Sequence, residues 1–449
     1  MTFSPQQAIL TLGRMFYDPV EAADFPETIL RYRNDRAAAS VGLDGLSDDQ
    51  WIAHFGRFQP LPGSLPQPLA LRYHGHQFRH YNPDIGDGRG FLFAQMRDSD
   101  GRLLDLGTKG SGQTPYSRFG DGRLTLKGGV REILATEMLE ALGVNTSKTF
   151  SLIETGEALH RGDEPSPTRS AVMVRLSHGH IRIGSFQRLA YHQQADEMRV
   201  LVDYVLRNLY GVEPGPDPAV QLLDQVVART ARLAGQYMAA GFVHGVLNSD
   251  NINVTGESFD YGPWRFTPTW DVGFTAAYFD EGGLYAFGRQ PEAIHWDAMQ
   301  LAVSLRLLAE SDALIAVLET FADRYQLAVT EAILWRLGVR PRGDQNDREL
   351  VQAIERALRD TGTPIDRFFF DFFAGVLPPD RDGFDEVCHR LAAYVPRKPR
   401  GHPYWADAEP CSMLIEEVEA IWEPIAASDD WTALHAKVAQ IRRMGEALA

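Results

Sequence analysis

Residues 244–263 read HGVLNSDNINVTGESFDYGP and follow closely on the segment AVQLLDQVVARTARLAGQYMAAG at residues 219–241. Apolar residues recur in the earlier segment at the spacing of one helix face, which predicts a helix that ends at Gly241. The residues on that face are Val220, Leu223, Val227, Ala234 and Met238. In the later segment His244 and Asn251 stand seven positions apart, and the triplet Asp-Tyr-Gly begins at Asp260. A predicted helix, a polar loop and an acidic triplet therefore follow one another in this part of the chain.

The loop has the layout of a protein-kinase catalytic loop, H-x-D-x-x-x-x-N, followed by a short strand and a D-F-G triplet. One position departs from it, because Val246 stands where the catalytic Asp belongs. Asn251 and Asp260 carry the oxygen donors that Mg²⁺ prefers, and the strand and turn between them would bring them together. Ordinary hydrogen-bonding roles in a loop are the alternative for both residues. The stretch therefore predicts a nucleotide and metal site that lacks the usual base and has Asp250 beside Asn251.

The regions on either side of this loop predict an α+β chain. From about residue 85 to 190, a strand hairpin, a helix and two further strands follow one another in the order of a kinase N-lobe. Long amphipathic helices dominate from about residue 195 onward. We therefore expect a protein-kinase-like two-lobed fold in three parts. These are an N-terminal extension that wraps another unit (1–70), a kinase-like N-lobe (71–195), and a helical C-lobe with a C-terminal helical extension (196–449).

The stretch IGDGRG at residues 85–90 is a candidate phosphate-binding loop. Gly86 and Gly88 would let backbone N–H groups approach a phosphate closely. Arg89 adds a fixed cation suited to bidentate phosphate contact. Taken alone, the motif also fits a plain hairpin turn, because Asp-Gly pairs favour such turns.

Residues 106–132 hold a local excess of basic side chains in an otherwise acidic protein, which makes them a candidate polyphosphate site. The basic residues are Lys109, Arg118, Arg123, Lys127 and Arg131. Lys109 ends a strand where a kinase places its phosphate-binding lysine, which pairs with a helix Glu. We predict Glu132 as that partner, with Glu137 as the alternative. Arg175 and Arg182 bracket a turn and could join the site, although their spacing alone favours surface positions.

Composition limits the partners of the chain. It has 449 residues, of which 44% are hydrophobic and 23% charged, and its formal net charge is −16. Such a charge disfavours nonspecific binding to nucleic acid or to an anionic membrane. We find no run of about 18 apolar residues and no signal-peptide pattern at the N-terminus, so we expect a soluble cytoplasmic protein.

Cysteine and histidine do not complete a metal or disulfide pattern. Two cysteines, Cys388 and Cys411, cannot form a disulfide framework and fit a reducing compartment. His74, His76 and His80 lie within seven residues. Their spacing and the absence of neighbouring Cys or acidic residues do not complete a tetrahedral zinc site, so we expect structural roles for them.

Eight motifs, in consistent order over about residues 70–300, resemble the selenoprotein O family of kinase-like protein adenylyltransferases. They are HGHQF, YNPDIGDGRG, KGSGQTPYSRFGDGR, REIL, SHGHIRIGSF, HGVLNSDN, DYGP and YAFGRQP. The resemblance implies a pseudokinase fold that binds ATP and Mg²⁺ or Mn²⁺. It further implies that ATP lies in the reverse of the kinase orientation, and that AMP is transferred to Ser, Thr or Tyr hydroxyls of proteins with release of pyrophosphate.

The resemblance also implies roles for individual residues. Those matched to the glycine-rich loop and to nucleotide or phosphate contacts are Gly86, Gly88, Arg89, Lys109, Asp121, Gly122, Arg175, Arg182 and Asp260. Asp250 matches the proposed catalytic base, and Asn251 and Asp260 match the metal ligands. The chain departs from the family pattern at Ser249, which is commonly Thr, and at residues 128–129, where two glycines replace two serines and predict a looser helix start. It also ends in RRMGEALA, without the terminal selenocysteine or cysteine of many members.

Two other functions are compatible with parts of this pattern. An ordinary kinase or small-molecule phosphotransferase would share the start of the loop, but Val246 argues against it. A catalytically inactive nucleotide-binding scaffold would not need Asp250, Asn251 and Asp260, all of which are present.

Overall fold

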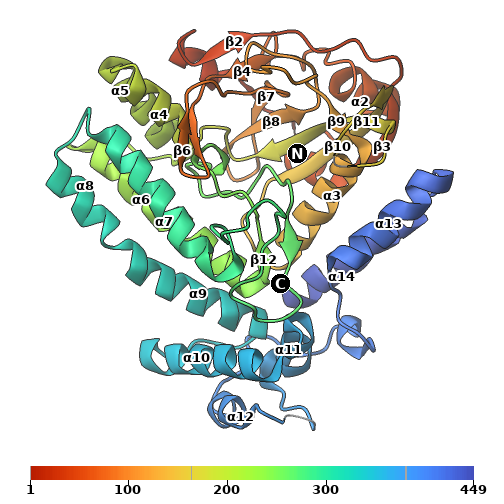
Figure 1. The fold of residues 1–449 in the computed structure, drawn as a ribbon, viewed down its shortest axis with the longest axis vertical. Helices are drawn as coiled ribbons and strands as arrows, with labels where there is room; N and C mark the ends of the chain where they lie inside the picture. The colour runs from red at the N-terminus through yellow and green to blue at the C-terminus, as the bar shows by residue number, and fades with distance from the viewer. Residues whose placement is uncertain (1, 163, 380–381) are drawn as a thin grey trace.

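The computed structural model describes residues 2–162, 164–379 and 382–449, which fold into a mixed α+β molecule (Figure 1). A twisted sheet occupies one end of the molecule, and long helices form the other. The α+β class is therefore confirmed. The protein-kinase-like description and the three-part division stay predictions.

In the described residues the sheet has nine strands, and all of its paired neighbours are antiparallel. The strands are β1 (Pro5–Gln6), β2 (Tyr17–Pro19), β3 (Ile29–Arg33), β4 (Leu69–Leu71), β7 (Leu92–Arg97), β8 (Leu103–Lys109), β9 (Leu124–Thr125), β10 (Lys148–Leu159) and β11 (Thr168–Ser177). Their order is β2-β4-β7-β8-β11-β10-β3, with β1 beside β7 and β9 beside β11. The N-terminal segment therefore supplies β1, β2 and β3 to this sheet.

Helix α3 (Leu126–Ala141) follows β9 and packs against the sheet. The Thr125 side chain caps it by accepting a hydrogen bond from the Gly128 N–H at 3.1 Å. A Cβ at Gly129 would lie 2.3 Å from a methyl group of Leu152 on β10, so glycine allows helix and strand to approach closely. The helix thus begins before the glycine pair and is capped, unlike the looser start that the two glycines predict.

The remaining helices form the other end of the molecule and two flanks of the sheet (Figure 1). They are α1 (Asp35–Ser40), α2 (Asp48–Phe55), α4 (Ile183–Tyr191), α5 (Ala195–Tyr204), α6 (Pro218–Ala240), α7 (Gln290–Leu305), α8 (Ser311–Leu318), α9 (Phe321–Leu337), α10 (Asp344–Thr361), α11 (Ile365–Phe372), α12 (Asp385–Leu391), α13 (Ile415–Ser428) and α14 (Thr432–Leu448). Helix α6 ends as predicted at Gly241, which adopts a left-handed conformation with φ of 69°. Helix α14 returns to pack against α3.

Two small two-stranded sheets complete the described part of the fold. β12 (Phe242–Val243) pairs with β13 (Arg265–Phe266) and spans the loop that the sequence singled out. β5 (Gly75–Gln77) pairs with β6 (His80–Asn82), between the sheet and the helices. Lys109 at the end of β8 lies 3.3 Å from Asp260, at the far end of this loop.

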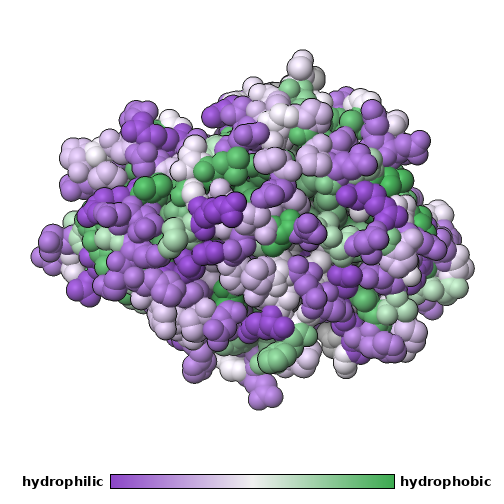
Figure 2. All heavy atoms as spheres, turned by 90° about the horizontal axis from the view of Figure 1, so that it is seen from above, coloured by the Kyte–Doolittle hydropathy of each residue, from purple (hydrophilic) through white to green (hydrophobic). Residues whose placement is uncertain are grey.

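The core and the exterior follow the usual division of side chains. On one side of the sheet, Trp51 of α2 stacks on Phe150 of β10 with ring centroids 4.9 Å apart. The face in Figure 2 is mainly hydrophilic, with hydrophobic residues in small scattered groups. Within the described ranges, no helix combines the length and the apolar character needed to cross a bilayer.

Cys388 and Cys411 are both buried, and burial raises the pKa of the Cys411 thiol to about 12.

Candidate active site

A cleft of about 680 Å³ lies between the glycine-containing loop, the end of β8 and the polar loop after β12. Its lining residues are 73, 77, 85–90, 108–109, 116–123, 161, 175, 182, 246, 248, 250–251, 260 and 262. Every residue that the family resemblance matches to nucleotide, metal or catalytic contacts is among them. The fold thus brings together residues from several separate stretches of chain, although the roles of these residues stay predictions.

The glycine-containing loop is held in place by the segment that follows β8. A Cβ at Gly86 would lie 2.5 Å from the ring of Tyr116, and one at Gly88 would lie 2.9 Å from the Tyr116 carbonyl oxygen. Ser117 donates a hydrogen bond from its hydroxyl to the Gly88 carbonyl. Because any side chain at these two positions would collide, the sequence needs glycine here. Arg89 at the loop tip is exposed and lines the cleft.

Lys109 at the end of β8 forms a buried ion pair with Glu132 of α3. Its amine also lies 3.3 Å from a carboxylate oxygen of Asp260. The predicted pairing with Glu132 is confirmed, and the alternative Glu137 is wrong. Glu137 instead binds Arg442 of α14 at 2.6 Å, on the other side of the helix from the cleft. The pairing with Glu132 holds the Lys109 charge in the cleft.

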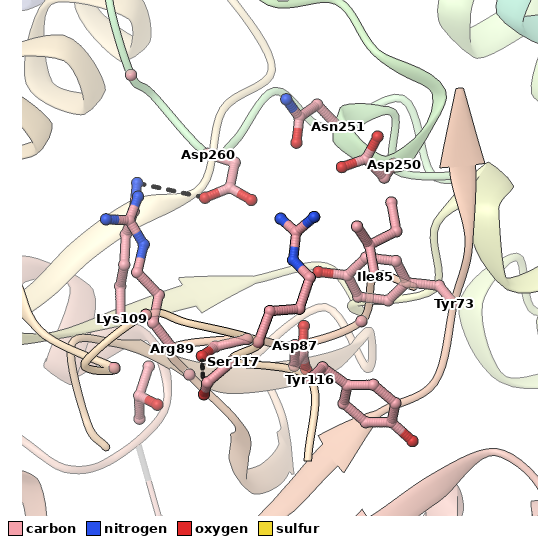
Figure 3. A pocket seen from close by; sticks show the side chains of 18 of the residues that line it. Tyr73, Ile85, Asp87, Arg89, Lys109, Tyr116, Ser117, Asp250, Asn251 and Asp260 are labelled. Carbon is pink, nitrogen blue, oxygen red and sulfur yellow. Dashed lines mark hydrogen bonds and ion pairs between the residues drawn. The ribbon is translucent and has the colours of Figure 1, made fainter. Parts of the chain in front are cut away.

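The carboxylate of Asp260 lies among the cationic side chains of the cleft (Figure 3). It lies between Lys109 on one side and Asn251 and Asp250 on the other. Arg175 approaches it to 3.2 Å and Arg182 to 3.0 Å. Burial opposes ionisation of this carboxyl, but Arg175, Lys109 and Arg182 outweigh it and hold its pKa well below the usual range.

The surface positions that spacing favoured for Arg175 and Arg182 are wrong. Their exposed fractions are 4% and 3%. Burying a guanidinium requires a partner, and Asp260 supplies the charge. The ring of Phe259 adds a cation–π contact, with centroid distances of 4.9 Å to Arg175 and 4.7 Å to Arg182. These two arginines are therefore fixed components of the cleft.

Asp250 and Asn251 lie in the 3₁₀ turn η3 (Ser249–Asn251). Asp250 is buried, and its Oδ1 has no hydrogen-bond partner in the described part of the chain. Burial raises the pKa of this carboxyl to about 6, against the opposing charge of Arg182. Asn251 donates from Nδ2 to the Val246 carbonyl at 2.9 Å, which leaves its Oδ1 available as a ligand atom. A turn of this kind presents two different oxygen groups to one cleft.

The outer part of the cleft contains Asp121 and Gly122. Gly122 has a φ of 71°, and a Cβ there would lie 2.3 Å from the backbone of Gly112. Asp121 pairs at 2.8 Å with Arg161, which the sequence analysis did not identify. Burial opposes ionisation of Asp121, yet Arg161 and Arg123 keep its pKa below the usual value.

Part of the predicted basic site points elsewhere. Lys127 binds Glu419 of α13 at 2.7 Å, and Arg131 donates to the Trp264 carbonyl at 3.0 Å. Only Lys109, Arg118 and Arg123 of the five basic residues line the cleft. Because α3 turns successive side chains to different faces, a run of charges in sequence does not stay together in space.

The β5–β6 hairpin covers the polar loop, and no sequence signal indicated this. The His76 N–H donates to the Ser249 hydroxyl at 2.7 Å, and the Phe78 N–H donates to Asn248 Oδ1 at 3.0 Å. Nδ1 of His76 lies 2.6 Å from the Gln187 side-chain amide.

Across the described residues, no cluster of three or more His, Cys, Asp or Glu side chains could hold a metal ion.

A further buried carboxyl, Asp297 of α7, was also not identified from the sequence. It is fully buried, and neither oxygen has a hydrogen-bond partner within the described residues. Burial and the nearby charge of Asp250 raise the pKa of Asp297 well above its usual range. These surroundings therefore favour the protonated form of Asp297.

The donor set fits a small divalent cation. Asn251 and Asp260 both present oxygen atoms to the cleft, and Mg²⁺ commonly takes one or two protein oxygens together with phosphate oxygens and water. The cations around Asp260 suit the phosphates of the same ligand. The cleft thus combines candidate metal ligands with cations that suit phosphate.

Comparisons with known proteins identify the family of this chain. The family model described as protein adenylyltransferase SelO matches residues 1–391. The chain is 44% identical to the protein nucleotidyltransferase YdiU of Synechocystis sp., over 96% of each chain. It is also 44% identical to the protein of that name from Synechococcus elongatus, over 100% of this chain and 97% of that protein. With the one from Aeromonas salmonicida it shares 36% identity over 78% of this chain and 72% of that protein. The chain therefore belongs to the SelO family of protein adenylyltransferases.

Proposed function

We propose that this protein transfers AMP from ATP to Ser, Thr or Tyr hydroxyls of other proteins and releases pyrophosphate. The observation that carries the proposal is the pairing of a deep cationic cleft with a buried carboxylate at Asp250, where Val246 replaces the kinase base. A kinase without that base has lost the group that accepts the substrate proton. Asp250 offers another such group one residue from a candidate metal ligand.

The charge distribution supports ATP in the reverse of the kinase orientation. The inner part of the cleft holds Lys109, Arg175 and Arg182, whose exposed fractions are 5%, 4% and 3%. Terminal phosphates suit such a region far better than an adenine ring does, because buried cations need anionic partners. With the terminal phosphates held there, the α-phosphate faces Asp250. Arg89 at the exposed loop tip then covers the phosphate chain.

Each residue of the polar loop has a distinct role in this proposal. The acceptor oxygen attacks the α-phosphorus, its O–P bond forms, and the bond from the α-phosphorus to pyrophosphate breaks. Asp250 accepts the hydroxyl proton, and a pKa of about 6 keeps it ionised at neutral pH. Asn251 and Asp260 would hold Mg²⁺ or Mn²⁺, which supplies charge stabilisation for the departing pyrophosphate. The basic side chains around Asp260 stabilise the same group.

The co-product distinguishes this reaction from phosphoryl transfer. The protein is incubated with ATP, Mg²⁺ and dephosphorylated casein as a generic hydroxyl-bearing acceptor, and the released nucleotide and phosphate species are separated. AMP transfer yields pyrophosphate in proportion to modified casein. Production of ADP with phosphorylated casein would instead identify a kinase and reject the proposal.

A further inference from the structure

Two hydroxyl groups tie the segment after β8 to the backbone of the glycine-containing loop. The Thr114 hydroxyl donates to the Asp87 carbonyl at 2.5 Å and accepts from the Tyr116 N–H at 3.1 Å. The Ser117 hydroxyl donates to the Gly88 carbonyl and accepts from the Thr114 N–H at 2.8 Å. A hydroxyl has one hydrogen to donate, so the direction of each bond is fixed. The position of the loop therefore depends on the position of this segment.

Tyr116 connects the same loop to the N-terminal part of the sheet. Its ring lies against Gly86, where a Cβ would be 2.5 Å from the ring. Its hydroxyl points away from Asp260 (Figure 3) and donates to the carboxylate of Asp18 on β2. Arg72 donates to this carboxylate from Nε at 2.9 Å. The hydrogen bond with Arg72 keeps the pKa of Asp18 below its usual value, which makes the carboxylate a charged acceptor for both groups.

The other side of the loop is bound to β4. The Leu71 N–H donates to Asp87 Oδ2 at 3.0 Å, and the Asp87 N–H donates to the Leu71 carbonyl at 3.1 Å. Strand β4 is fixed in turn by its backbone pairing with β2. The loop is thus held by β4 on one side and by Tyr116 on the other, and Asp18 joins Tyr116 to the sheet. A hydrogen-bonded network of this kind makes a loop more rigid.

We propose that Asp18 and Tyr116 form a clamp that holds the glycine-containing loop in the conformation that binds the phosphates of ATP. The inference rests on the proposed function, which places the phosphate chain beneath this loop. Tyr116 positions the loop, and Asp18, which is not among the residues that line the cleft, acts through Tyr116. A loop that is ordered before the ligand arrives loses less conformational freedom on binding, which raises affinity.

Tyr116→Phe tests the clamp because it removes the hydrogen bond to Asp18 and keeps the ring against Gly86. In calorimetric titrations with Mg²⁺, ATP affinity should fall about tenfold, the value of a hydrogen bond to a charged group. Adenosine affinity should stay within about twofold of the native value, because adenosine has no phosphate to contact the loop. A general structural defect would lower both affinities or neither.

Tyr394→Phe is the matched control. Its hydroxyl also bonds to a carboxylate, that of Asp347 at 2.8 Å, and neither residue lines the cleft. The substitution removes the same kind of hydrogen bond at a distant position, so both ATP affinity and adenosine affinity should stay at the native values.

A double-mutant cycle tests whether Asp18 acts through Tyr116. Asp18→Ala should weaken ATP binding by about the same factor as Tyr116→Phe, and the double variant should show no further loss, because the backbone pairing of β2 with β4 remains. Native ATP affinity in Tyr116→Phe, an equal loss for adenosine, or multiplicative losses in the double variant would overturn the clamp. Thermal unfolding identifies the folded variants, and Tyr116→Phe alone tests the clamp if Asp18→Ala does not fold.

The outcomes also separate this inference from the function on which it rests. A native chain that transfers no α-phosphate label to casein, beside the expected loss of ATP affinity in Tyr116→Phe, contradicts AMP transfer and supports the clamp. A native chain that transfers the label, beside native ATP affinity in Tyr116→Phe, contradicts the clamp alone. If the native chain binds ATP no more tightly than adenosine, both the phosphate pose and the clamp are contradicted.

Discussion

The amine of Lys109 pairs with the carboxylate of Glu132, and both residues are buried at the boundary between β8 and α3. The pair fixes a cation at the inner end of the cleft, where Asp260 also approaches it to 3.3 Å. Two carboxylates therefore surround one amine. The Lys109 charge is held in place before any ligand binds, which is the condition for strong phosphate binding in a site shielded from water.

Arg89→Ala is expected to weaken ATP binding by about 10- to 100-fold, the usual value of a hydrogen bond to a charged group. Adenosine affinity should be unchanged, because the guanidinium contacts phosphate in the proposed pose. Isothermal titration calorimetry with both ligands measures the difference. Arg102→Ala is the matched control, since Arg102 pairs with Asp98 outside the cleft. An equal loss for ATP and adenosine would count against phosphates beneath this loop.

Substitutions of Asp250 and Asp260 are expected to affect different properties, the transfer rate and the metal dependence of ATP binding. Asp250→Ala should retain metal-dependent ATP binding and lose about 10²- to 10⁴-fold in AMP transfer, the usual cost of removing a general base. Asp260→Asn should instead lose the effect of Mg²⁺ on ATP affinity. The measurements are ATP titrations with and without Mg²⁺, and transfer rates at saturating ATP. Near-native transfer by Asp250→Ala would show that these roles are wrongly assigned.

Arg442→Ala should destabilise the fold although it lies outside the cleft. Arg442 of α14 donates to both oxygens of the buried Glu137 at 2.6 and 2.8 Å. Removing Arg442 leaves the buried Glu137 with the more distant Arg36 at 3.5 Å as its remaining cation. Because Arg442 is itself 32% exposed, we expect the free energy of unfolding to fall by about 3 kcal/mol. Urea unfolding measures this loss of stability.

The neighbouring Arg443 provides the control for that experiment. It pairs with Asp407 near the surface, so Arg443→Ala should cost about 1 kcal/mol or less. The double variant Arg442→Ala with Glu137→Gln should recover part of the loss, because no buried charge remains. Equal effects of the two arginine substitutions would show that α14 does not depend on this pair.

Glu257 should make stability depend on pH. Burial raises the pKa of its carboxyl from 4.5 to about 7. Between these values the folded chain keeps a proton that the unfolded chain releases, so stability falls as pH rises and the loss is complete above 7. Glu257→Gln keeps the acceptor for the His178 N–H. The free energy of unfolding of this variant, relative to that of the native chain, should be higher at pH 8 than at pH 5 by at most about 3 kcal/mol. Urea unfolding at both pH values measures this difference between variant and native chain. An equal difference at pH 5 and pH 8 would contradict the raised pKa of Glu257.

The sequence was informative wherever a short contiguous pattern carries the geometry. The glycine that ends α6, the loop with Asn251 and the strand-end position of Lys109 each depend on neighbours within a few residues. The predicted pairing of Lys109 with Glu132 is confirmed as well. These features predicted the central part of the cleft.

Contacts between distant parts of the chain could not be read from such patterns. Arg175 and Arg182 are buried because Asp260, 85 and 78 residues later, neutralises them. The hairpin contact between His76 and Ser249 joins residues 173 positions apart. Glu137 meets Arg442 across 305 positions. In each case the local sequence fits several environments, and tertiary packing selects one.

The position of the isotope in the product tests the central claim most directly. The native chain is incubated with Mg²⁺, casein and ATP labelled either at the α-phosphate or at the γ-phosphate, and label bound to protein is measured after denaturing separation. The account predicts protein-bound label from the α-phosphate alone, and its loss in Asp250→Ala. Label from the γ-phosphate alone would contradict the account and identify a kinase, and label from neither would identify a nucleotide-binding scaffold.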